Sequence, residues 1–370
     1  MKSRFVYYLN KKYSALETIL LEPLISDQLL SPFQITLSAL QIQTIKNEIK
    51  AYWALRNWGE QNLVSQYSEL KLRQSQNYSA CMSYDFHINP LGQPELIEIN
   101  TNASFLALGL ELYAFLGFPN PAGNFGEAEL VEMFESELKL CGASDNSIAI
   151  IDENPDTQRL YAEFLIYRQL FKNRGINSEI FNFDEIESYK KFSLIYNRYT
   201  DFYLQEPKSA KIKELFNAGL LNLSPNPFEY FLLADKQRLL DWNNQTAIQK
   251  PASLLKVYDM ATENKDTIWD LRKNLFFKPK NSFGGKQAYK GASISRKIFE
   301  EVATSKFVAQ QLSVPAQVTF DYENTSLELK YDLRCFAYQD QLQLVVARLY
   351  QGQMTNLKTP GGGFACVTIG

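Results

Sequence analysis

The sequence has 370 residues, of which 45% are hydrophobic and 14% aromatic, so the chain can bury a sizeable core, and its length suggests about two or three domains. Its formal net charge of −3 argues against the broad basic surface that holds nucleic acid. The single histidine, His87, excludes a metal site built from several histidines and leaves a hard cation on oxygen ligands as the metal to expect.

The cysteines and the hydropathy pattern bear on the compartment. Four widely spaced cysteines without a CxxC motif are typical of reduced thiols, so we expect a cytoplasmic protein. Apolar runs are interrupted long before the ~20 residues that a membrane-spanning helix needs. We therefore expect neither a membrane nor a nucleic-acid partner, and the sequence leaves the oligomeric state open.

Helices and a hairpin are predicted in the first 140 residues. Apolar residues at three- and four-residue steps predict helical structure across 34–75, and an amphipathic pattern predicts a helix over 125–140. Between them, residues 82–88 and 95–100 alternate between apolar and polar on either side of a turn-rich segment. This pattern is typical of a β-hairpin.

The middle of the chain predicts a small parallel α/β unit. A buried strand at 147–152 is followed by a helical pattern over 156–173 and by strands near 178–181 and 193–196. After a turn-rich junction, Asp235 and Lys236 open a further helix. From about residue 271 the sequence is mostly strand-like.

The hairpin brings acidic groups together. If its turn is centred between Leu91 and Gly92, Asp85 lies directly opposite Glu98, and Asn100 shares the face of Glu98. Facing carboxylates repel each other, and a divalent cation between them reverses that effect. Two carboxylates and an amide oxygen suit Mg²⁺, whereas a solvated face with mispaired charge is the alternative. The opposite face is expected to enter a core through Phe86, Ile88, Ile97 and Ile99.

Later segments carry further charged candidates. Lys278 is followed by Gly284 and Gly285, and such a loop either closes backbone N–H groups on an anion or is an ordinary turn with solvated lysines. Arg348 lies in an apolar run, where an arginine is costly unless it is paired. We expect it either to form an ion pair with Asp332 or to clamp a phosphate.

One polar segment follows a strand of the α/β unit. Asn197 and Arg198 stand at the carboxyl end of that strand, where ligands of parallel sheets gather. They are candidates for substrate contact, and a turn with local hydrogen bonds is the alternative. For His87, a structural role is favoured over a catalytic one.

Taken together, these residues resemble the ATP-grasp superfamily in circularly permuted order, and within it the group of eukaryotic-type glutathione synthetase and glutathionylspermidine synthetase. The run LYQGQMTNLKTPGGGF further suggests a bacterial branch of that group. The resemblance implies a metal site formed by Asp85, Glu98 and Asn100. It implies nucleotide binding by Lys236, Lys278, Gly284, Gly285, Gln310, Gln311 and Asp332. It implies that the catalytic groups are Arg334 and Arg348, and that substrate contacts include Asn197, Arg198, Asn102 and Asn356.

Two departures from the family pattern concern the substrate side. The family often has an arginine two residues before the metal aspartate, and here that residue is Ser83. The loop after the metal asparagine is often rich in glycine and proline, and here it reads Thr-Asn-Ala-Ser-Phe over residues 101–105. The missing arginine leaves Arg334 or Arg348 to serve as the acyl-phosphate clamp.

The resemblance implies an α/β (α+β) class: a circularly permuted ATP-grasp fold with a Rossmann-like pre-ATP-grasp domain. The expected parts are a helical region with the metal hairpin (1–140), the Rossmann-like domain (141–230), and a nucleotide-binding region (231–370) with a lid at about 271–305. The implied activity is an ATP- and Mg²⁺-dependent carboxylate–amine or carboxylate–thiol ligase that forms an acyl phosphate from a small-molecule or peptide carboxylate. A small-molecule kinase and a non-catalytic nucleotide-binding protein are the alternatives.

Overall fold

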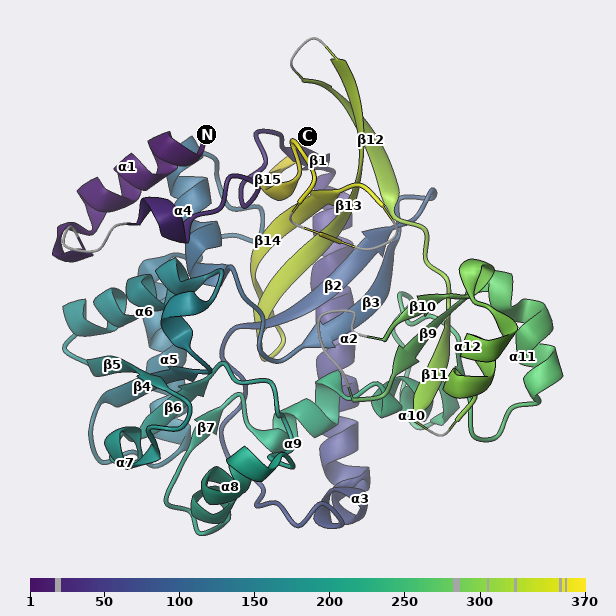
Figure 1. Cartoon of the computed structure of the whole chain (residues 1–370), viewed down its shortest axis with the longest axis horizontal. Helices are drawn as coiled ribbons and strands as arrows, with labels where there is room; N and C mark the ends of the chain where they lie inside the picture. Colours follow the sequence, from purple (N-terminus) through teal and green to yellow (C-terminus); the bar gives the residue numbers. More distant parts are fainter. Residues whose placement is uncertain (17–20, 282–286, 305, 323–324, 353–354, 357) are drawn as a thin grey trace.

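The computed structural model describes residues 1–16, 21–281, 287–304, 306–322, 325–352, 355–356 and 358–370. These residues form three β-sheets with helices packed around them, so the predicted α/β (α+β) class is confirmed. In Figure 1 the largest sheet lies near the centre, the parallel sheet at the lower left and the smaller antiparallel sheet at the right. Within the described ranges, no helix has both the length and the apolarity that crossing a membrane requires.

The largest sheet joins strands from both ends of the chain. Its order is β1-β15-β14-β13-β2-β3, and β12 pairs with the first half of β13. The first strand runs parallel to the last, and the other neighbours are antiparallel. The strands are β1 Ile35–Leu37, β2 Met82–Ile88, β3 Pro94–Asn100, β12 Ala316–Tyr322, β13 Thr325–Tyr338, β14 Gln341–Tyr350 and β15 Gly363–Ile369.

Two helices cover opposite faces of this sheet, because successive side chains of a strand point to opposite sides. Along β14, Val345 belongs to the core formed with α2 (Ala39–Asn62), and Leu344 belongs to the core formed with α4 (Leu106–Leu116). Gly109 lets α4 approach the strand closely, since a Cβ atom there would lie 2.7 Å from Leu344 Cδ2. The sheet is therefore buried on both faces.

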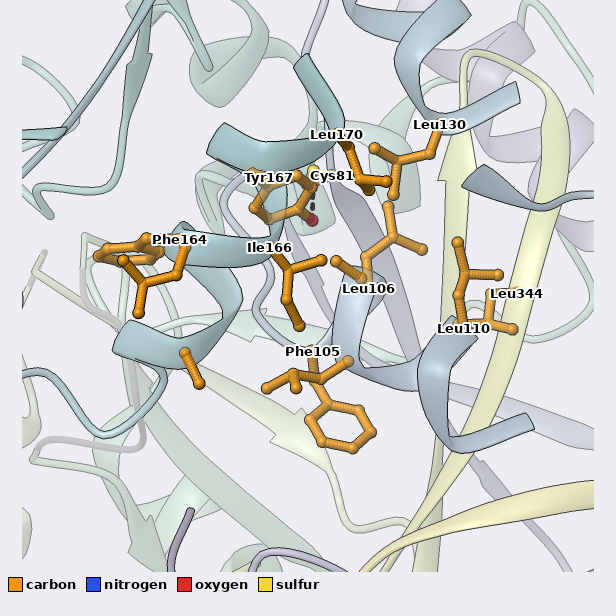
Figure 2. Packing of buried hydrophobic residues seen from close by; sticks show 14 of the residues in the cluster. Cys81, Phe105, Leu106, Leu110, Leu130, Phe164, Ile166, Tyr167, Leu170 and Leu344 are labelled. Atoms are coloured by element: carbon orange, nitrogen blue, oxygen red, sulfur yellow. Dashed lines mark hydrogen bonds between the residues drawn. The ribbon is translucent and has the colours of Figure 1, made fainter. Parts of the chain in front are cut away.

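Figure 2 shows the packing on the α4 side of the sheet. Side chains from α4, α5 (Glu127–Leu140) and α6 (Tyr161–Asn173) meet those of β14, and the only hydrogen bond drawn among them joins Cys81 to Tyr167 at 3.2 Å. The labelled residues of the cluster are Cys81, Phe105, Leu106, Leu110, Leu130, Phe164, Ile166, Tyr167, Leu170 and Leu344. This core fixes α4, whose first turn lies beside the candidate site.

The helix predicted over 34–75 is shorter than expected at both ends. Residues 35–37 form β1 instead, and α2 begins at Ala39, because the Ser38 side chain accepts a hydrogen bond from Gln41 N and the Gln41 side-chain oxygen accepts one from Ser38 N. The short helix α3 (Val64–Ser68) follows, and residues 69–75 are not helical. A capping box thus overrides the apolar spacing of the first residues.

The parallel α/β unit is confirmed. Its strands lie in the order β5-β4-β6-β7 and all run parallel. Helix α6 begins five residues later than the predicted start at 156, because a 3₁₀ turn at Pro155–Thr157 precedes it. The strands are β4 Ser147–Asp152, β5 Asn177–Asn182, β6 Leu194–Asn197 and β7 Leu223–Ser224, and the remaining helices nearby are α7 Ile186–Tyr189, α8 Ala210–Asn217 and α9 Pro227–Glu229.

The third sheet is antiparallel, with the order β10-β9-β11-β8, and it lies beside the β2–β3 hairpin (Figure 1). Its helices begin with α10, which opens directly after Lys236 as predicted. The elements are β8 Val257–Asp259, β9 Leu275–Pro279, β10 Tyr289–Lys290, β11 Phe307–Gln311, α10 Gln237–Asn244, α11 Lys265–Leu271 and α12 Arg296–Val302, and α1 at the other end of the chain is Lys2–Lys12. The predicted lid glycines, Gly284 and Gly285, lie outside the described residues.

Candidate active site

The β2–β3 hairpin has the predicted register at its acidic end, where Asp85 lies opposite Glu98. Beyond that pair the register shifts, and Phe86 lies opposite Leu96. One residue, Ile97, is therefore left over as a β-bulge. The prediction that Ile97 faces the core was wrong for this reason: its side chain lines a cavity, and Leu96 takes the buried position.

Asp85 is fully buried and lies at the centre of a charged network. Its Oδ1 accepts hydrogen bonds from Ser83 Oγ and Arg334 Nε, both at 3.1 Å. Its Oδ2 accepts from Arg334 and Arg348, both at 2.8 Å, and from Asn100 Nδ2 at 3.2 Å. Burial alone would raise the pKa of this carboxyl group, but the two guanidinium groups outweigh burial and lower the pKa to about 2.

The network continues across the strands of the large sheet. Pairing places Arg334 opposite Asp85, and Asp332 opposite Arg348. Arg348 Nε donates to Asp332 Oδ1 at 2.6 Å, and Thr355 donates to the other oxygen of Asp332. Of the two alternatives for Arg348, the ion pair is the one observed, and Asp85 provides a second carboxylate.

Two buried lysines face this network. The Lys278 side chain, 7% exposed, donates to Ile97 O at 2.9 Å and to Gln310 Oε1 at 2.6 Å. Burial lowers the pKa of Lys278 to about 8, against the opposing attraction of Glu98, and burial also lowers the pKa of Lys236. Across the described ranges, no carboxylate lies within ion-pair distance of Lys278. A buried cation in this state favours an anionic ligand.

A cavity of about 740 Å³, here called the main cavity, opens between the large sheet, the β9–β11 sheet and the start of α6. Its wall is strongly cationic, with an apolar portion that includes Ile97, Leu255, Phe276 and Leu312. The acidic groups that line it are Glu98 and Asp332, and the cationic groups are Arg159, Lys236, Lys278, Lys290, Lys330, Arg334, Arg348 and Lys358. The wall suits a ligand with an apolar or aromatic end and several negative charges.

A second cavity of about 470 Å³, here called the side cavity, adjoins the first. Three residues line both cavities: Ser104, Lys236 and Arg334. The remaining lining of the side cavity is mostly polar and includes Asn100, Asn102, Asp152, Glu153, Gln158 and Arg198. A group bound in one cavity therefore lies next to a group bound in the other, with Arg334 between them.

Arg198 fixes the loop that separates β3 from α4. Its guanidinium group donates to the side chains of Asn102 and Ser104 and to the Ala103 carbonyl, the last at 3.2 Å. From α6, Glu163 accepts hydrogen bonds from the first backbone N–H groups of α4. These hydrogen bonds hold residues 101–104, which line the side cavity, in place.

The other predicted residues are distributed as follows. Gln310 and Gln311 line the main cavity, and Gln310 donates to Leu96 O at 3.2 Å. Asn356 also lines that cavity, and its Nδ2 donates to a backbone carbonyl at 2.7 Å. Asn197 instead forms a turn, where its side chain accepts from Tyr199 N at 3.1 Å. His87 lines the main cavity with Nδ1 3.1 Å from Ser313 Oγ, and burial lowers its pKa.

Sequence reasoning missed two cavity-lining positions near the carboxyl end of β4. Asp152 is the last residue of that strand, and burial raises its pKa. Arg159 reaches the main cavity from the turn before α6. The sequence contained a signal for Asp152, because this residue ends a predicted strand and ligands bind at the carboxyl edge of a parallel sheet. The position of Arg159 depends on the late start of α6, which the apolar pattern does not reveal.

No family model and no curated protein matches this chain. Among solved structures, the apo form of a glutathione synthetase-like effector from Globodera pallida matches with a TM-score of 0.57 and 11% identity, over 92% of this chain and 90% of that chain. A Methylobacillus flagellatus protein provisionally assigned as a γ-glutamylcysteine synthetase matches with a TM-score of 0.41 and 9% identity, over 85% of this chain and 84% of that chain. The first match shows that this chain has a glutathione synthetase-like fold.

Proposed function

We propose that this protein is an ATP-dependent carboxylate–amine ligase of circularly permuted ATP-grasp type, with a thiol as the other possible acceptor. The proposal rests on one observation: a cationic cavity and a polar cavity adjoin each other at Arg334. A ligase that activates a carboxylate with ATP needs such a pair of sites, because the terminal phosphate and the carboxylate must meet while both are bound. The fold shared with a glutathione synthetase-like effector supports the same class.

The main cavity is the proposed nucleotide site. Its volume lies within the range of small-ligand sites, roughly 300–1,000 Å³. Lys236 and Lys278 stand where they can neutralise phosphate oxygens, and the binding of an anion offsets the burial that lowers the pKa of both lysines. The apolar lining, which includes Phe276 and Leu255, is suited to a base, and Gln310 and Gln311 line the same cavity.

The donor set between the cavities also fits Mg²⁺. Glu98 lines the main cavity and Asn100 lines the side cavity, and both offer oxygen. Asn100 uses its Nδ2 for Asp85 and Glu98, at 3.2 and 3.3 Å, so its Oδ1 is directed elsewhere. Bound there, the ion would neutralise phosphate charge. Among the described residues no group of three or more His, Cys, Asp or Glu side chains could hold a metal, and the proposed donor set includes the Asn100 amide oxygen.

The side cavity is the proposed site of the substrate to be joined. Arg198 and Arg334 supply positive charge for a carboxylate, and Asp152 with Glu153 supplies negative charge for an ammonium group. A ligand with both kinds of group, such as an amino acid or a small peptide, matches this lining. Arg198 and Asp152 bind such a ligand through charge alone and need no histidine. This agrees with a site that acts by positioning the reactants and neutralising their charge.

The proposed reaction has two steps. A carboxylate oxygen forms a bond to the terminal phosphorus of ATP as the bond to the ADP oxygen breaks, which gives an acyl phosphate. The amine nitrogen then forms a bond to the acyl carbon, the bond from that carbon to the phosphate oxygen breaks with release of inorganic phosphate, and the amine loses a proton. Arg334 and Arg348 line the main cavity, and in this proposal they stabilise the charge of the transferred group.

The test is a screen for ADP release with Mg-ATP and a panel of amino acids, glutathione and polyamines, followed by trapping with hydroxylamine. A ligase yields a hydroxamate of its carboxylate substrate. ADP release with a phosphorylated hydroxyl product and no hydroxamate would instead indicate the kinase alternative. ATP binding without ADP release in the presence of any of these metabolites would indicate a non-catalytic nucleotide-binding protein. The matched variants are Lys278→Ala, expected to weaken ATP binding strongly, and Lys280→Ala, expected to leave it nearly unchanged.

A further inference from the structure

We infer that Asp85 is a positioning residue that holds Arg334 and Arg348 where the two cavities meet, and that the metal-binding oxygens come from Glu98 and Asn100 alone. The inference rests on the proposed function for what the arginines act upon. It differs from the sequence-based expectation, in which all three hairpin residues bind the metal. The difference follows from the contacts and the charges around Asp85.

The contacts of Asp85 occupy both of its oxygens. Two donors, Ser83 Oγ and Arg334 Nε, reach Oδ1, and three donors, from Arg334, Arg348 and Asn100, reach Oδ2. An ionised carboxylate has about four lone-pair sites in all. These donors therefore saturate Asp85, and a metal ion could bind there only if at least one arginine left.

The charges around Asp85 point the same way. Its carboxylate is fully buried, and Arg334 and Arg348 are only 11% and 14% exposed at their side chains. A divalent ion bound to the same oxygens would lie close to two guanidinium groups in a poorly hydrated environment, where like charges repel strongly. Arg348 also pairs with Asp332 at 2.6 Å, so it is anchored from two sides and is not free to withdraw.

The neighbouring oxygens lack such donors. Glu98 accepts at Oε1 from Asn100, at 3.3 Å, and in the described part of the chain no donor reaches its Oε2. Within the described residues no donor reaches Asn100 Oδ1 either, because the Nδ2 group makes the contacts with Asp85 and Glu98. Asn100 thus links the two functions: its amide nitrogen binds the carboxylates, and its amide oxygen remains for a cation.

The first experiment uses the wild-type protein and needs no substrate. The arginine Nε–H groups of Arg334 and Arg348 are assigned by NMR from single Arg→Lys variants and followed during titration with Mg²⁺ and with Mg²⁺ plus a non-hydrolysable ATP analogue. If Asp85 holds the arginines throughout, both signals keep their slow solvent exchange at saturating metal. The Arg334 signal is the decisive one, because its Nε–H is bonded to Asp85, whereas the Nε–H of Arg348 is bonded to Asp332. Loss of the Arg334 signal on metal binding would show that the ion displaces this arginine, which overturns the inference.

The second experiment compares Asp85→Asn with Glu98→Gln, using Mn²⁺ alone as the probe in electron paramagnetic resonance titrations. Loss of a direct ligand in Glu98→Gln is expected to raise the Mn²⁺ dissociation constant about tenfold or more, and Asp85→Asn is expected to raise it clearly less. Asp85→Asn should instead abolish the slow exchange of the Arg334 signal, whose Nε–H is bonded to Asp85. Equal loss of Mn²⁺ affinity in the two variants, or no Mn²⁺ binding to the wild type, contradicts the inference.

If Asp85→Asn does not fold, the wild-type titration decides. Failure of the ligase assay would leave both measurements standing, since neither depends on turnover.

Discussion

Replacement of Lys278 by methionine should stabilise the protein while removing its nucleotide affinity. Lys278 is 7% exposed, and burial is the main cause that lowers its pKa from 10.5 to about 8. One pKa unit corresponds to about 1.4 kcal/mol, so the charged lysine destabilises the folded state by about 3 kcal/mol at neutral pH. Methionine fills similar space without charge, and it leaves Ile97 O and Gln310 without their donor, which costs about 1 kcal/mol.

The sign of the pH dependence distinguishes this explanation from a simple packing effect. Because the pKa of Lys278 is lower in the folded than in the unfolded chain, the penalty is full below about pH 8 and disappears as the pH rises through 10.5. Lys278→Met should therefore be about 2 kcal/mol more stable than the wild type at pH 7 by denaturant unfolding, and the gain should vanish at high pH.

The matched control is Lys280→Met. Lys280 lies just beyond β9, and its Nζ is 3.5 Å from Asp259, so it has a carboxylate partner that Lys278 lacks within the described residues. We expect no gain in stability for this variant. A gain at Lys278 that is independent of pH, or a gain of equal size at Lys280, would refute the reasoning about the buried charge.

Two further substitutions test the surroundings of the cavities. Glu163→Gln should lower the free energy of unfolding by about 1–3 kcal/mol, because Glu163 accepts the first backbone N–H groups of α4, and chemical denaturation measures this loss. Gln310→Leu removes an acceptor from the charged form of Lys278 and should lower the pKa of that lysine further. In the variant, ATP affinity measured by calorimetry should begin to fall at a lower pH than in the wild type; an unchanged pH profile would contradict the role given to Gln310.

The acidic hairpin illustrates what local sequence can and cannot predict. Alternation in 82–88 and the turn residues after it were sufficient to place Asp85 opposite Glu98. The bulge at Ile97 was not predictable, because Leu96 and Ile97 are both apolar and either can occupy the buried position. In the folded protein the Ile97 carbonyl accepts a hydrogen bond from Lys278 of the neighbouring sheet, a contact between segments far apart in the sequence.

The charged network shows a second limit. The pairing of Asp332 with Arg348 could be proposed from the sequence, because both residues lie in adjacent strand-like segments. The pairing of Asp85 with Arg334 joins residues 249 positions apart, and no periodicity connects them. It arises because β2 lies beside β13 in the large sheet, an arrangement fixed only by tertiary packing.

The pairing of β1 with β15 has a consequence for synthesis of the chain. Residues 35–37 and the 82–100 hairpin leave the ribosome long before β13, β14 and β15, which are their neighbours in the large sheet. The nascent chain therefore exposes unpaired strand edges and apolar side chains until the last strand has been made. We expect the protein to depend on chaperones during translation and to fold slowly after release, as is usual where most contacts are distant in sequence.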